Sequence, residues 1–118
     1  MHKRIRSFGF AFSGLRYLIA SEHNAWIHLA ATASAVLLGF AVRLTVGEWL
    51  WIVAAISGVW LAEAFNTAIE RLADVISMER DPRLKVVKDV AAAGVLVSAI
   101  TAAIMGFLVF YPHLRGWF

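Results

Sequence analysis

Apolar and polar positions follow one another along the chain in a pattern that predicts four helical segments. Residues 3–20 carry apolar side chains at steps of three and four, which predicts an amphipathic helix lying in a membrane interface. Apolar segments follow at about residues 25–42, 48–76 and 86–111, each of a length to cross a hydrocarbon core of about 30 Å. We expect Pro112 to end the last of them. The pattern predicts an all-α membrane protein with one interfacial helix and three transmembrane helices.

The composition agrees with a membrane location and leaves room for a single domain. Of the 118 residues 61% are hydrophobic and 16% are charged, whereas soluble domains average about 45–50% and 25%. Cysteine is absent, which excludes disulfides, thiolate nucleophiles and cysteine–zinc sites. Three spans use most of the chain, so residues 1–118 are expected to form one membrane domain.

The distribution of lysine and arginine predicts the orientation in the membrane. Four of these residues precede the first span, and five lie within residues 71–88. The loop between the first two spans carries only Arg43, and the segment after the last span carries only Arg115. Positive residues favour the cytoplasmic side, so the N-terminus and the 71–88 loop are expected in the cytoplasm and the C-terminus outside. This asymmetry also explains the net charge of +3 better than nucleic-acid binding does.

The second span contains an unusual series of polar residues. Its members are acidic or amide side chains: Glu63, Asn66, Glu70 and Asp74. At about 100° per residue they fall within an arc of roughly 80°, so they share one face of the helix. A charge near the middle of a membrane costs at least a few kcal/mol, so this face predicts a hydrated cleft with a function. An inter-helix polar network is the alternative.

Further charged residues are expected at the same depth as this series. Glu22 lies at the start of the first span, and Lys88 and Asp89 lie at the start of the third. Carboxylates beside a lysine suit Mg²⁺ that bridges nucleotide phosphates, because this hard cation prefers oxygen ligands. Glu22 or Lys88 alone would be interpreted as a helix-end charge, but their coincidence with the polar series favours a site.

Three other features allow two interpretations each. Arg16 lies at the edge of the apolar face of the first helix and is either a snorkelling side chain or a phosphate contact. His28, one turn inside the first span, is interpreted as an interfacial or packing group and is assigned no chemistry. A stripe of small residues in the last span is interpreted as a packing surface, with a functional cavity as the alternative; it comprises Ala91, Gly94, Ser98, Ala102 and Gly106.

The polar series resembles the signature of a known family, the small prokaryotic membrane lipid kinases that comprise diacylglycerol kinase and undecaprenol kinase. The segment Glu63-Ala-Phe-Asn66-Thr67-Ala-Ile-Glu70-Arg-Leu-Ala-Asp74 is similar to the family's Glu-x-x-Asn-[Ser/Thr]-Ala-Ile-Glu-x-x-x-Asp. Lys88-Asp89-Val-Ala-Ala resembles its Lys-Asp-x-x-[Ala/Ser]-Ala element. Gly14-Leu15-Arg16 and Glu22 also stand at the expected places, so the resemblance covers nearly the whole chain.

The resemblance implies a role for each of these residues. Glu63 would be the catalytic base that receives the proton of the lipid's primary hydroxyl. The other implied roles are Mg²⁺ binding by Glu22 and Glu70, nucleotide binding by these two with Lys88, Asp89 and Lys3, and substrate binding or support by Asn66, Asp74 and Arg16. ATP would be the phosphoryl donor, although the chain has no P-loop. The resemblance further implies a homotrimer in the bacterial inner membrane with sites between subunits.

The sequence favours undecaprenol over diacylglycerol as the substrate. The stretches Glu22-His-Asn24-Ala-Trp-Ile27-His28-Leu and Asp81-Pro82-Arg-Leu-Lys85-Val-Val-Lys88-Asp89 resemble the undecaprenol kinase branch. Phe10 stands where the enterobacterial diacylglycerol kinase pattern has tyrosine, so it is assigned no nucleotide role, and Lys3 replaces an arginine.

A non-enzymatic membrane assembly or an ion-conducting protein is the alternative of another class. A conduction path needs polar groups across the full membrane thickness. The stretches 49–61 and 95–109 offer almost none, so the acidic groups occupy only the cytoplasmic half. This one-sided distribution favours a catalytic site.

Overall fold

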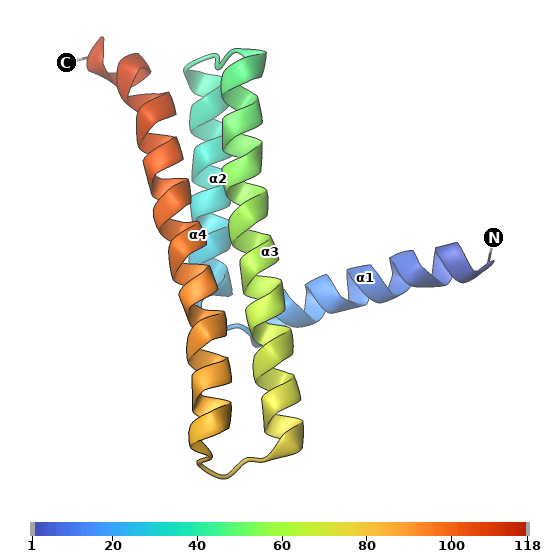
Figure 1. The fold of residues 1–118 in the computed structure, drawn as a ribbon. Coiled ribbons are helices and arrows are strands. Elements are labelled where there is room, and N and C mark those ends of the chain that lie inside the picture. Colours follow the sequence, from blue (N-terminus) through green and yellow to red (C-terminus); the bar gives the residue numbers. More distant parts are fainter. Residues whose placement is uncertain (1, 118) are drawn as a thin grey trace.

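The computed structural model describes residues 2–117 and consists of four helices (Figure 1). Their bounds are α1 His2–Ser21, α2 Ala25–Ala41, α3 Val46–Ile76 and α4 Pro82–Arg115. Helices α2, α3 and α4 stand side by side as an antiparallel bundle, and α1 projects away from it. No strand is present among the described residues, so the all-α prediction is confirmed.

Two of the three predicted spans are confirmed by length and composition. Helices α3 and α4, with 31 and 34 residues, are both long and apolar enough to cross a membrane. Helix α2 has only 17 residues, which rise about 26 Å at 1.5 Å per residue, just short of the hydrocarbon core. It qualifies as a third span only together with α1, from which it is bent by 108°.

Helix α1 matches the predicted interfacial helix in its bounds and its exposure. Only Leu18 is buried, and the apolar stripe that includes Phe8 and Phe12 is open to the surroundings. The helix is held at its C-terminal end, where Arg71 Nε donates to the Tyr17 hydroxyl at 2.7 Å. The apolar stripe therefore needs lipid or another protein surface to cover it.

Local sequence signals set the ends of α2 and α3. Arg43 has a left-handed φ of 59°, and the N–H groups of Arg43 and Leu44 reach back to the carbonyls of Phe40 and Gly39, which closes α2 with a Schellman motif. Helix α3 then begins with a capping box, because the Thr45 hydroxyl accepts from the Glu48 N–H and the Glu48 carboxylate accepts from that of Thr45.

Helix α4 is longer than predicted at both ends. It begins at Pro82, the first helical position, where a missing N–H costs nothing, and Asp81 caps it. The Arg83 side chain and N–H hold the pKa of Asp81 below its usual value, so the cap is ionised at neutral pH. Pro112 does not end the helix, which continues to Arg115. Its last turn is fixed by His113 Nε2, 2.7 Å from Glu48 Oε2 on α3.

The packed core lies at the end of the bundle where α2 joins α3. Buried side chains of Leu44, Ile52, Val109 and Phe110 form it. Gly39 is also buried there, and a Cβ at this position would lie 2.5 Å from Trp49 Cη2 and 3.0 Å from Leu44 Cδ1. The core therefore fixes the end of the bundle opposite to the polar series of α3.

Gly39→Ala is expected to destabilise the protein by about 1–3 kcal/mol, because the added methyl overpacks the Trp49 contact. Thermal unfolding in detergent measures this change. Gly58→Ala is the matched control, since a Cβ there meets nothing within 4 Å and alanine favours helix. Equal melting temperatures for the two variants would contradict the predicted overpacking.

Candidate active site

The polar series lies along one side of α3 and is its most buried polar part. Glu63, Asn66 and Thr67 are only 6%, 8% and 4% exposed. Glu70 and Asp74 follow toward the C-terminal end of the helix and are half-buried. Buried polar groups are costly unless they are hydrogen-bonded, so the partners of these side chains define the site.

Glu63 is paired with a histidine from α2. His28 Nε2 lies 2.6 Å from Glu63 Oε1, and the two side chains are 21% and 8% exposed. The sequence assigned His28 no chemistry, yet the structure places it directly on the carboxylate that the family resemblance makes the catalytic base. The sequence pattern carried no signal for this contact, because the contact depends on how α2 is aligned along α3.

Two further carboxylates contact the segment after Glu63. The Thr67 hydroxyl donates to Glu22 Oε1 at 2.5 Å, which joins the α1–α2 turn to α3. Asn66 Nδ2 donates to Glu70 Oε1 at 3.4 Å, one helical turn along α3. Asn66 Oδ1 is buried and has no partner among residues 2–117. Thr67 had no assigned role in the sequence, although it stood inside the motif.

The C-terminal end of α3 meets the start of α4 through charged side chains. Lys88 Nζ lies 2.7 Å from Asp74 Oδ1, so the predicted lysine does reach the polar series. Asp89 instead faces Lys85, at 2.6 Å, and its side chain is 61% exposed. Within one chain, Asp89 is therefore not part of the site.

Lys3 and Arg16 also lie apart from the polar series. Both side chains belong to α1 and are exposed, and neither forms an ion pair within the described residues. Lys3 is near the outer end of α1, which points away from the bundle (Figure 1). Their predicted contacts with nucleotide or substrate remain predictions.

Glu22 and Glu70 differ from the aspartates in the groups that contact their carboxylates. Each of the two glutamates accepts from a neutral donor, and neither has a cationic partner within ion-pair distance among residues 2–117. All three aspartates pair with lysine or arginine. In the same part of the chain no three histidine, aspartate or glutamate side chains gather at metal-binding distance. Two carboxylates without an ion pair still suit Mg²⁺, which commonly takes one or two carboxylates with phosphate oxygens.

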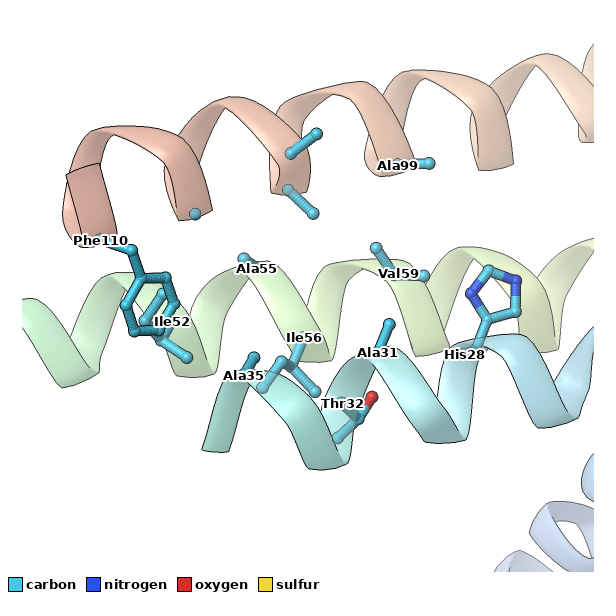
Figure 2. A pocket seen from close by; sticks show the side chains of 13 residues that line it. His28, Ala31, Thr32, Ala35, Ile52, Ala55, Ile56, Val59, Ala99 and Phe110 are labelled. Atoms are coloured by element: carbon cyan, nitrogen blue, oxygen red, sulfur yellow. The ribbon is translucent and has the colours of Figure 1, made fainter. Parts of the chain in front are cut away.

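An apolar cavity of about 310 Å³ lies between α2, α3 and α4 and reaches His28 at one end. Figure 2 shows its lining side chains, with His28 at one end and Ile52 and Phe110 at the other. Most of its walls are small residues, among them Ala102 and Gly106 of the α4 stripe. This stripe therefore borders a cavity here, besides any packing purpose. An apolar chain in this cavity would therefore lie next to His28, which contacts Glu63.

Comparisons with known proteins identify the family of the chain. Residues 9–110 match the family described as prokaryotic diacylglycerol kinase. The chain is 36% identical over 114 residues to an undecaprenol kinase of Bacillus subtilis, which covers 97% of this chain and 93% of that protein. It is 28% identical over 109 residues to a diacylglycerol kinase of Synechocystis sp., covering 92% of this chain and 62% of that protein.

The family match covers the whole polar series and three helices almost completely. It excludes the alternative of a non-enzymatic assembly or an ion-conducting protein. The resemblance found in the sequence motifs is confirmed. The chain therefore belongs to the prokaryotic diacylglycerol kinase family and is a membrane lipid kinase.

Proposed function

We propose that this lipid kinase transfers the γ-phosphoryl group of ATP, with Mg²⁺, to the primary hydroxyl of undecaprenol. The observation that carries the proposal is a buried carboxylate, Glu63, whose partner His28 lies at the end of an apolar cavity. A long prenol presents the matching shape, a single hydroxyl at the end of an apolar chain. Phosphoryl transfer needs a group that accepts the hydroxyl proton, and Glu63 supplies it.

The charge distribution along α3 supports a proposed place for Mg²⁺ and ATP. Glu22 and Glu70 would hold Mg²⁺, which neutralises the charge of the transferring phosphoryl group when it is bound. Lys88, oriented by Asp74, would contact the phosphates. Asn66 has a buried carbonyl oxygen without a partner among the described residues, and this oxygen can accept a hydrogen bond from a bound hydroxyl.

A homotrimer with sites between subunits is part of the proposal. Three of the proposed contact residues are exposed on the single chain: Lys3, Arg16 and Asp89. Their proposed contacts with nucleotide or substrate therefore require a site that a neighbouring subunit completes, or a nucleotide whose phosphates extend to them. The exposed apolar stripe of α1 would be covered by lipid and by such a neighbour. Residues 1–20 and 71–88 would face the cytoplasm, where ATP is found, with the C-terminus outside a bacterial inner membrane.

Undecaprenol is preferred because the near full-length relative is an undecaprenol kinase, whereas the match to a diacylglycerol kinase is weaker and covers less of that protein. Phosphorylation of diacylglycerol to phosphatidic acid is the second candidate, and the description of the family favours it.

The test is a side-by-side assay of purified protein in mixed micelles with γ-labelled ATP and either lipid. We expect labelled undecaprenyl phosphate to form faster than labelled phosphatidic acid, and a chelator of Mg²⁺ to stop both. Faster phosphatidic acid formation would assign the second candidate. No labelled lipid from a folded, helical protein would contradict the proposed reaction.

A further inference from the structure

We propose that His28 is a positioning residue for Glu63: it donates a hydrogen bond from Nε2 to Oε1 and so turns Oε2 toward the substrate hydroxyl. The inference rests on the proposed role of Glu63 as base. The 2.6 Å contact is the only one that the Glu63 carboxylate makes to a side chain of residues 2–117. The second oxygen, Oε2, accepts no hydrogen bond there and is not fully buried.

The imidazole packs against Trp60, which is itself held by a hydrogen bond. Its ring packs edge-on against Trp60, with centroids 6.0 Å apart at 66°. Trp60 Nε1 in turn donates to the Thr32 hydroxyl at 3.0 Å. Because His28 and Thr32 are four residues apart on α2, and Trp60 and Glu63 three apart on α3, each pair shares a helix face. These contacts fix the orientation of the imidazole before any substrate binds.

A carboxylate in this place needs such a partner. Glu63 is 6% exposed, and a buried carboxylate without a hydrogen bond is costly. One donor satisfies Oε1 and leaves Oε2 free to accept the proton of the substrate hydroxyl. A displacement of about 1 Å of a reacting group can cost on the order of 10²-fold in rate, so this orientation matters for turnover.

In the proposed reaction His28 keeps its proton throughout. The lipid hydroxyl oxygen forms a bond to the γ-phosphorus while the bond between this phosphorus and the bridging oxygen of ADP breaks. The hydroxyl proton moves to Glu63 Oε2, and the electron pair of the broken bond leaves with ADP. Nε2–H of His28 stays on Oε1 and holds the carboxylate in place.

Two substitutions separate hydrogen bonding from packing. His28→Gln keeps an N–H close to the position of Nε2, whereas His28→Met keeps volume and loses the donor. We expect His28→Met to lower kcat about 10- to 100-fold with little change in the KM for ATP. His28→Gln is expected to keep kcat within about threefold of the parent enzyme.

The second histidine–glutamate pair of the fold provides a matched control. His113 Nε2 lies 2.7 Å from Glu48 Oε2 at the opposite end of α3, away from the polar series. His113→Met should change the melting temperature and leave kcat unaltered. Near-parental kcat in His28→Met, or equal losses in His28→Met and His28→Gln with the helical content intact, would overturn the positioning role. Failure of the proposed function would give a different result from failure of the positioning role, because the parent enzyme itself would then be inactive on both lipids.

Discussion

Glu63→Gln is expected to lower kcat for lipid phosphorylation by about 10²- to 10⁴-fold, the usual contribution of a general base. Glutamine has nearly the same shape, and its Oε1 can still accept from His28 Nε2, so the bundle should keep its structure. Its amide cannot receive the hydroxyl proton. Affinity for the nucleotide should persist, because Glu63 lies deeper along α3 than Glu70 and Asp74.

The measurement is single-turnover phosphorylation together with nucleotide binding in the same detergent. Glu79→Gln is the matched control, because Glu79 is an exposed glutamate of the α3–α4 connection with no assigned role. It should retain the parental rate. A near-normal rate in Glu63→Gln would remove Glu63 as the base, and lost nucleotide binding would assign it to the phosphate site instead.

Helix-forming pattern and charge spacing predicted most of the fold and the composition of one helix face. The apolar segments located α3 and α4, and the spacing of Glu63, Asn66 and Glu70 placed them on one side of α3. These are local properties, set by the 3.6-residue period within a single helix. They hold whichever neighbour packs against the helix.

The contacts between helices were not predictable from the same pattern. The His28–Glu63 pair depends on how α2 is aligned along α3, which also places Glu22 beside Thr67. Pro112 looked like a helix end, but the His113–Glu48 contact between α4 and α3 holds one more turn. Each of these contacts joins residues at least 35 positions apart on different elements, so no local rule contains them.

The acidic residues differ in the chemical type of the side chains that contact their carboxylates. The aspartates sit beside lysine or arginine and are locally neutralised, which suits helix ends and the α3–α4 connection. Glu63 has an imidazole that can support a base, and Glu22 and Glu70 have neutral donors that leave their charge available. A cation and its phosphate ligands would find the charge of Glu22 and Glu70 near the middle of the polar series.

Glu70→Gln is therefore expected to raise the Mg²⁺ concentration needed for half-maximal rate by about 10- to 100-fold, at least as much as losing an outer-shell partner of a metal site. The glutamine keeps an acceptor for Asn66 Nδ2 but loses the charge that a hard cation prefers. Rates are measured over a Mg²⁺ titration at fixed ATP, with Glu79→Gln as the control that should follow the parent curve.

Excess Mg²⁺ distinguishes the two roles on α3. In Glu70→Gln it should restore most of the rate, because only the affinity for the metal–nucleotide complex is lowered. In Glu63→Gln it should restore nothing, because the proton acceptor is absent at any metal concentration. An unchanged Mg²⁺ requirement in Glu70→Gln would reassign this residue to the support of Asn66 and leave Glu22 as the metal-binding carboxylate of the chain.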